Sequence, residues 1–422
     1  MGQDFYPHLG YITLSHLHPT QNGICLNDVP RLSAENWKAF RVSTPSISFS
    51  PLPNFLLDFG SIRTMLEYRF TVLDAYVDVN GLPTFVVAKE PIKEKFQELL
   101  RDLRNHALSA KIRQVSNKLV ISVFPKPVLG KPRKLINVAL FLATMGTVGL
   151  ASYYFIFAVD SRLTAALFAK SNLWLEVILL AISILGIVGI HEMGHVMAVR
   201  HHRMDASLPY FVPAPPPFPF GTFGAVISLR GPPGNRDQLF DLGFSGPIAG
   251  FFATIAVALF AYFTSPIIPQ QQADLLLKAN LLSQSPWPYT PLLLDIMERL
   301  SLRTVPAGQV LVFTQIALAA EVGALITFLN ILPVWQLDGG HLARAAFGVK
   351  GHKIAALAGF GILMLAGYWG FAMMLIIFML ISRRPLEGVE PLDDVSPLSN
   401  SRKLFFLFAL VMFLFCFVII QV

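Results

Sequence analysis

Apolar stretches close to the ~20-residue length of a membrane-spanning helix dominate the chain from residue 135 onward. We count seven of them. The fifth and sixth stretches are each short for a span, so residues 353–381 could instead form one long tilted helix, which would leave six spans. The seven predicted spans are residues 135–159, 173–199, 244–263, 310–332, 353–366, 369–381 and 404–422.

Basic residues between the predicted spans favour seven spans over six. With seven, the pairs Arg383-Arg384 and Arg402-Lys403 fall on the same side of the membrane as the basic residues near 200, 230 and 344–353. A single helix over 353–381 would place these two pairs on the opposite side. Because basic loops mark the cytoplasmic side, we expect seven spans with the amino terminus in the cytoplasm, in a multi-pass protein of the cell membrane.

The pattern before residue 135 is different and predicts a small α+β unit. Residues 70–79 alternate loosely between apolar and polar, Asn80-Gly81 is a hairpin signal, and residues 84–88 form the return strand. A helix then follows Pro91, with Phe96, Leu99, Leu100 and Leu103 at helical spacing, and residues 119–124 form another strand. The predicted order is ββαβ, and residues 1–60 show no clear pattern.

Composition supports this division. Hydrophobic residues make up 54% of the chain and charged residues 14%, where a soluble protein carries about 25%. Residues 1–134, which we call the head, hold 17 of the 33 Lys and Arg and 11 of the 26 Asp and Glu. These values exclude a disordered chain, a nucleic-acid-coating protein and an ordinary cytosolic enzyme. We therefore predict an α-helical polytopic membrane protein, with a cytoplasmic α+β domain over 1–134 and a membrane domain over 135–422.

Two further features bear on location. Lys126, Lys131, Arg133 and Lys134 stand directly before the first predicted span, as expected for the cytoplasmic side, and the first 30 residues lack the pattern of a secretory signal. With only Cys25 and Cys416, the chain has no disulfide framework and no cysteine-based zinc site.

The second predicted span ends in an HExxH motif, residues 191–195. On a helix, residues i and i+4 lie on the same face, so His191 and His195 can ligate one zinc ion while Glu192 acts as general base. Ionisable residues inside a membrane are costly unless they face a partner or a cavity, so their position strengthens the motif. The alternative is that they are polar residues packed between helices.

Two histidines leave the metal site incomplete, because catalytic zinc usually takes three protein ligands and a water. Near the end of the fourth predicted span, Pro333 breaks the helix and Asp338 stands before Gly339 and Gly340. Asp338 is the best third ligand in the sequence. The alternative reading is that Asp338-Gly339 is only a turn at the membrane edge.

Together, HEMGH at 191–195 and the NxxPxxxxDG pattern at 330–339 resemble the site-2 protease family of intramembrane zinc metalloproteases. Residues 221–226 and 235–250 are similar to the archaeal and chloroplast-type branch, and the resemblance covers roughly residues 119–422. It implies one zinc ion per chain held by His191, His195 and Asp338, with Glu192 as the catalytic acid and base. It also implies that Asn330 lies near the metal and hydrogen-bonds the substrate carbonyl or the developing oxyanion.

A proline-rich run over 209–219 precedes residues 221–229, which alternate between small and β-branched or aromatic residues. We interpret this region as a re-entrant β-hairpin that pairs with unwound substrate by strand addition. The alternative is a proline-rich loop without a substrate role. The predicted substrate-binding residues are Gly221, Thr222, Phe223, Gly224, Ala225 and Val226.

Three other polar features receive simpler interpretations. We expect His201 and His202 to form a solvated basic helix end, and His341 to lie beside the site without binding the metal. We expect Glu321, inside the fourth predicted span, to make an interhelical hydrogen bond or to be a protonated carboxyl group.

Three functions compete. The first is an intramembrane zinc endopeptidase acting on transmembrane protein substrates within the lipid bilayer, without nucleic acid. The second is a membrane-anchored HExxH protease for soluble or lipidated substrates, which would more often use a third His or Glu ligand. The third is a metal transporter or inactive scaffold, for which Glu192 beside the ligands would have no role. Oligomeric state and substrate identity stay open.

Overall fold

The computed structural model describes residues 58–126, 134–159, 173–214, 220–279, 291–300, 302–313, 315–382 and 388–417. Predictions that concern other residues lie outside this part of the chain. They concern the first 57 residues, Lys131 and Arg133, part of the proline-rich run at 215–219, Arg383 and Arg384, and the last five residues.

The described head is a four-stranded antiparallel sheet with two helices. Its elements are α1 (Phe59–Glu67), β1 (Val72–Val77), β2 (Pro83–Val87), α2 (Lys93–Asn105), β3 (Leu108–Val115) and β4 (Lys118–Pro125), and the strand order is β1-β2-β4-β3. The predicted strands, turn and helix are all present, whereas α1 and β3 were not predicted. The helices place Leu66, Phe96 and Leu99 against Phe85 and Ile121, all fully buried.

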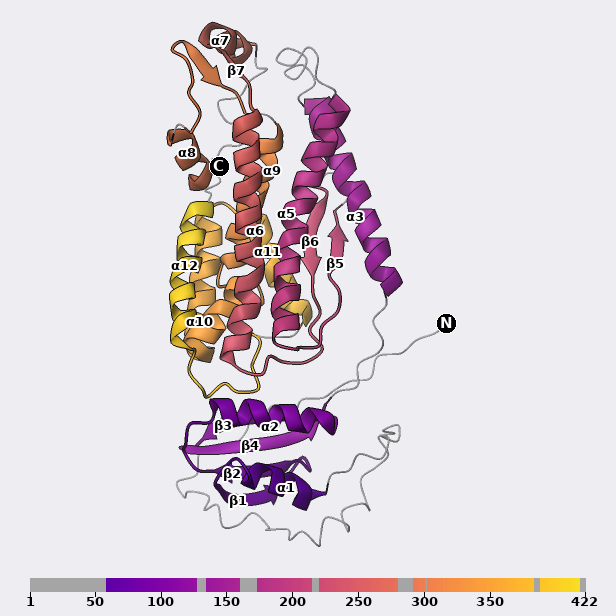
Figure 1. The fold of residues 1–422 in the computed structure, drawn as a ribbon, viewed down its shortest axis with the longest axis vertical. Coiled ribbons are helices and arrows are strands. Elements are labelled where there is room, and N and C mark those ends of the chain that lie inside the picture. Colours follow the sequence, from indigo (N-terminus) through magenta and orange to yellow (C-terminus); the bar gives the residue numbers. More distant parts are fainter. Residues whose placement is uncertain are drawn as a thin grey trace.

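Four helices in the described part of the chain are long and apolar enough to cross a membrane. They form a multi-pass membrane architecture above the head in Figure 1. They are α3 (Lys134–Tyr154, continued by a π-helical turn over Phe155–Val159), α5 (Leu173–His201), α6 (Arg236–Thr264) and α10 (Asp338–Leu365).

Three further apolar helices pack with them and are shorter than a typical span. They are α9 (Gln315–Ile331), α11 (Trp369–Ser382) and α12 (Asn400–Cys416). At the end of the helices away from the head lie β7 (Ile267–Pro269), α7 (Gln270–Lys278), α8 (Leu292–Arg299) and β8 (Gln309–Leu311), where β7 pairs with β8.

The predicted fourth to sixth spans differ from these helices in detail. Residues 309–311 form a strand, so the helix of the fourth span begins only at Gln315. The helix predicted from residue 353 begins fifteen residues earlier, at Asp338, and continues across a kink at Gly348. Gly367, at φ +83°, separates α10 from α11, so a single helix over 353–381 is wrong. Residues 366–368 form a turn that belongs to neither helix.

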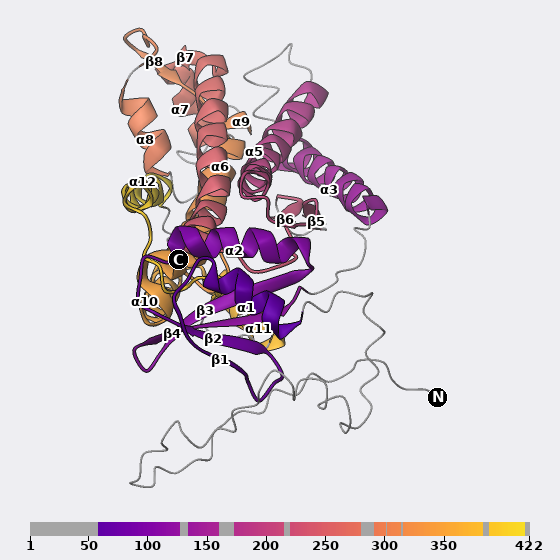
Figure 2. The ribbon, with the colours of Figure 1, turned by 60° about the horizontal axis from the view of Figure 1, so that its bottom comes forward.

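The segment over residues 388–399 attaches the head to the membrane helices. The backbone of Leu392 accepts a hydrogen bond from Ile112 in β3 and donates one to Pro233, before α6, at 3.0 and 2.8 Å. Its neighbour Asp394 accepts two hydrogen bonds from the Arg344 guanidinium of α10, at 2.7 and 2.8 Å. Head, α6 and α10 are thus tied together, with α2 facing the ends of the membrane helices (Figure 2).

Candidate metal centre

The HExxH residues lie in the last third of α5, on the side that faces the interior. His191, Glu192 and His195 are 3, 6 and 7% exposed, in a helix whose other face is apolar. The spacing of four residues brings the two Nε2 atoms within 3.2 Å of each other. The local helix alone therefore aligns two ligand atoms, as the motif predicts.

Asp338 reaches the same point from another helix. Its Oδ2 lies 3.2 Å from His191 Nε2 and 3.3 Å from His195 Nε2. It is the first residue of α10, where the N-terminal end of the helix dipole favours a carboxylate. The alternative of a simple turn at Asp338-Gly339 is wrong, because both residues are helical.

Glycines allow α10 to start this close to the end of α9. A Cβ on Gly339 would lie 1.8 Å from the Ile331 carbonyl oxygen, and one on Gly340 would lie 2.2 Å from that of Trp335. Any larger residue would push Asp338 away from the histidines. The two glycines that follow Asp338 are therefore a packing requirement of the site.

The three side chains fit a zinc ion. His195 Nδ1 lies 2.8 Å from the Leu242 carbonyl oxygen, which can only accept, so Nδ1 carries the proton and Nε2 keeps its lone pair. The lone pair of His195 Nε2 then faces the Asp338 carboxylate at 3.3 Å, which is unfavourable without a cation between them. Two ligands held tetrahedrally at 2.0–2.1 Å from zinc are about 3.3 Å apart, which matches the observed separations.

Helix α6 closes the site from a third side through small residues. A Cβ on Gly246 would lie 2.1 Å from His195 Nε2, and one on Gly250 would lie 3.0 Å from His191 Nδ1. A Cβ on Gly194 of α5 would likewise lie 2.1 Å from the Ser245 carbonyl oxygen. Gly246 and Gly250 were not predicted as part of the site, although their spacing of four places both on one helix face.

Two predicted catalytic residues lie on the elements that build the centre. Glu192 is buried in the same helical turn as the histidines. Asn330 is half-buried in the last turn of α9, next to Ile331, whose carbonyl oxygen lies against Gly339. The catalytic roles of Glu192 and Asn330 stay predictions.

The predicted substrate-binding segment forms a β-hairpin between α5 and α3 (Figure 1). Strand β6 (Thr222–Val226) pairs with β5 (Tyr210–Pro213), and β6 lies on the α5 side. Gly221, at φ +67°, approaches α3 so closely that a Cβ would lie 2.4 Å from the Thr147 carbonyl oxygen. The segment is therefore a strand rather than an irregular loop.

His202 differs from its interpretation, whereas one of the two interpretations of Glu321 stays a prediction. His202 is part of an ion-pair network, since its Nε2 lies 2.7 Å from Asp241 Oδ2 and Asp241 also binds Arg402. His202 is thus not part of a solvated helix end. Glu321 Oε2 is buried without a hydrogen-bond partner among the described residues, so the expected interhelical bond is not present at that oxygen, and a protonated carboxyl group stays the prediction.

HExxH and a carboxylate on apolar helices form a group that could hold a metal ion, which is the arrangement expected of a membrane-embedded metalloprotein. Residues 179–375 match the model of peptidase family M50. Over these residues, which include the HExxH motif and Asp338, the chain is similar to the site-2 protease family, in agreement with the resemblance carried by the motifs.

Curated relatives agree. The chain is 30% identical over 237 residues to "Probable zinc metalloprotease EGY1, chloroplastic" of Oryza sativa subsp. japonica, which covers 53% of this chain and 37% of the relative. The Arabidopsis thaliana protein of the same description is 31% identical over 236 residues, covering 53% and 39%. "Probable zinc metallopeptidase EGY3, chloroplastic" of Arabidopsis thaliana is 22% identical over 293 residues, covering 66% and 47%. The chain spans less than half the length of these relatives, and no solved structure matches it significantly.

Proposed function

We propose that the chain is an intramembrane zinc endopeptidase that hydrolyses peptide bonds in or near transmembrane segments of other membrane proteins. The observation that carries the proposal is the convergence of His191, His195 and Asp338 within hydrogen-bond distance of one another, inside apolar helices and beside Glu192. The match of residues 179–375 to the model of peptidase family M50 supports the reaction type.

In this proposal, His191, His195 and Asp338 hold one zinc ion per chain. A zinc ion bound there would polarise the scissile carbonyl and make water more acidic. Glu192 takes a proton from the attacking water as the new C–O bond forms, and it returns this proton to the amine as the C–N bond breaks. Asn330 donates a hydrogen bond from its side-chain amide to the carbonyl oxygen, where negative charge develops.

Strand β6 provides the substrate site in this proposal. A peptide bond inside a helix is shielded, so the substrate must unwind before it is attacked. An unwound segment can pair with the edge of β6 that faces α5, which is also the side of the HExxH helix. Phe223 and Val226, about half exposed, would contact its side chains.

We further propose that α3, α5, α6, α9, α10, α11 and α12 form seven spans, with the hairpin re-entrant between α3 and α5. The head lies in the cytoplasm on the positive-inside rule, on the same side as the end of α5. The cell membrane remains our expectation for the location, and the word "chloroplastic" describes the relatives.

The decisive variant is Glu192→Gln, tested on the full chain with a transmembrane reporter substrate. We expect cleavage to be abolished while zinc measured by mass spectrometry stays at one per chain, because the amide cannot accept the proton but leaves the ligands in place. Normal cleavage by this variant would contradict the mechanism. A metal transporter or an inactive scaffold would instead be insensitive to this change, since neither needs a base.

A further inference from the structure

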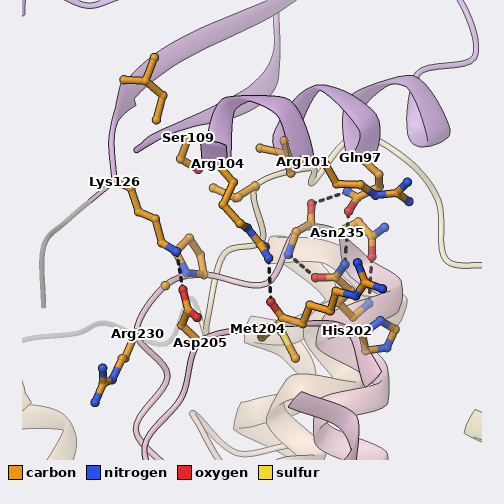
Figure 3. Close-up of a pocket in the computed structure, with 18 of the residues that line it drawn as sticks. Gln97, Arg101, Arg104, Ser109, Lys126, His202, Met204, Asp205, Arg230 and Asn235 are labelled. Atoms are coloured by element: carbon orange, nitrogen blue, oxygen red, sulfur yellow. Dashed lines mark hydrogen bonds and ion pairs between the residues drawn. The ribbon is translucent and has the colours of Figure 1, made fainter. Parts of the chain in front are cut away.

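A cavity of about 730 Å³ lies between the head and the adjacent ends of the membrane helices (Figure 3). Helix α2 and the edge of the head sheet form one wall, and the loop after α5 and the start of α6 form the other. Its volume falls in the range of roughly 300–1,000 Å³ that is typical of ligand sites. Nothing in the proposed chemistry uses it.

The acidic residues that line this cavity are already paired. Asp205 accepts a hydrogen bond from Lys126, and Asp237 lies 2.7 Å from Lys93 Nζ. The third, Asp102, is bound by Arg69 from outside the cavity. None of the three is therefore free to balance further positive charge.

Four lining arginines have no carboxylate partner among the described residues: Arg101 and Arg104 from α2, and Arg203 and Arg230 from the loops that follow α5 and β6. Among the described residues, the Arg104 guanidinium donates only to the Arg203 carbonyl oxygen, at 2.9 Å. Lys126, with Arg104 and Arg230 nearby, lowers the pKa of Asp205 below its ordinary value. The cavity therefore carries an excess of positive charge supplied from both walls, and an anionic ligand would relieve it.

The substrate hairpin leads directly to this cavity. Beyond β6, the two chains of the hairpin pair again through an isolated β-bridge between Ala206 and Leu229. Next to this bridge, the Arg230 amide donates a hydrogen bond to the Asp205 carbonyl oxygen, at 2.7 Å. From Val226 to Arg230 an extended chain advances about 13 Å, at about 3.3 Å per residue. A peptide paired with the edge of β6 would thus reach the arginines about four residues further on.

A second groove joins the two regions. It has a volume of about 310 Å³ and is lined in part by Val196, Val199 and Ile227, and it shares Met204, Asp205 and Arg230 with the cavity. Its apolar side borders the end of the HExxH helix. The path from the metal centre towards the head thus changes from apolar to cationic, which suits a chain that leaves the membrane.

We propose that this cavity binds the acidic flank of the substrate on the head side of the membrane and selects membrane proteins that carry Asp or Glu there. The inference rests on the proposed function, because it takes β6 as the substrate edge. A polypeptide is favoured over a lipid headgroup because only an extended chain uses the strand edge and the cavity together. Arg101, Arg104, Arg203 and Arg230 are then specificity-determining residues.

The test uses the full chain in vesicles of uncharged lipid and transmembrane reporters that differ only in the head-side flank. The flank is a short run of glutamates, of serines or of lysines, which defines the glutamate, serine and lysine reporters. We expect wild type to cleave the glutamate reporter about tenfold faster than the serine reporter, because two partly exposed ion pairs provide a factor of about that size. The ratio of the two rates should fall at high salt, since salt screens these pairs.

Matched variants locate this preference in the cavity. The variant Arg101→Glu/Arg230→Glu should lose the preference for the glutamate reporter and favour the lysine reporter, because the charge of two lining side chains is reversed. Lys118→Glu, an exposed position outside the cavity, is the matched control and should keep the wild-type preference.

Binding is measured separately with the Glu192→Gln chain and fluorescent glutamate and serine reporters. Equal dissociation constants for the two reporters would overturn the cavity proposal. If the wild-type chain cleaves no reporter but the glutamate reporter still binds more tightly than the serine reporter, only the proposed function is contradicted. The cavity proposal would also fail if anionic lipid, rather than the flank, controls binding, or if the double variant weakens all three reporters equally.

Discussion

Gly246→Ala is the sharpest test of how the metal centre is built. The substitution adds one methyl group to α6, and alanine by itself favours a helix over glycine by roughly 0.5–1 kcal/mol. Propensity alone thus predicts a slightly more stable protein. The packing of α6 against α5 predicts the opposite for the metal site.

The structure sets the size of the effect. The new Cβ would lie 2.1 Å from His195 Nε2 and 2.4 Å from Cε1, where non-bonded contacts need about 3.5 Å or more. The imidazole or the whole helix must therefore move by more than about 1 Å, while metal ligands tolerate only about 0.2 Å. Since a 1 Å misplacement in an active site costs about 100-fold in rate, we expect at least that loss of cleavage, together with loss of zinc.

Two glycines provide graded controls. Gly250→Ala brings a Cβ to 3.0 Å from His191 Nδ1, so a shift of a few tenths of an ångström suffices and the loss should be much smaller. Gly189→Ala, in α5, meets nothing within 4 Å and should keep wild-type zinc and activity. Zinc per chain and reporter cleavage are measured on all three variants. Full zinc occupancy in a folded Gly246→Ala chain would refute the assignment of His195 Nε2 as a ligand atom.

Three further outcomes follow from the same contacts. Asp338→Ala should lower zinc affinity by at least about tenfold, measured by chelator competition, because one of three ligands is lost; unchanged affinity would exclude Asp338. Asp394→Asn should destabilise the chain by about 3 kcal/mol, seen as a lower Tm in detergent, because the substitution removes the carboxylate that pairs with the Arg344 guanidinium, whose side chain is 1% exposed. The Tm difference between wild type and Asp205→Asn should stay constant from about pH 7 to about pH 5 and vanish only as the pH falls below the ordinary value of 3.8, since Lys126 lowers the pKa of Asp205; a difference already lost at pH 5 would contradict this.

Several elements of this protein could be predicted from local sequence patterns alone. The pairing of His191 with His195 depends only on 3.6 residues per helical turn, and the helix of α5 depends only on a long apolar run, so both could be predicted without tertiary information. The hairpin of β1 and β2 was equally accessible, because Asn80-Gly81 marks the turn.

Strand β3 shows where local patterns fail. It is an edge strand with Lys111 and Arg113 on its outer face, and among its residues only Ala110 and Ile112 are buried. Two core residues, one of them small, do not produce a clear alternation. The strand forms because β4 and the segment around Leu392 offer hydrogen-bond partners to its backbone.

The sequence by itself determined the membrane helices, the HExxH ligand pair and the α+β character of the head, because each depends on side chains within a few residues of one another. Only the tertiary structure decided that Asp338 opens α10 rather than closing a span, that Gly246 and Gly250 make room for the two imidazoles, and that the head and the adjacent ends of the membrane helices enclose a cationic cavity. These features join residues far apart in the chain, and their distances depend on how closely the helices pack, which no local pattern encodes.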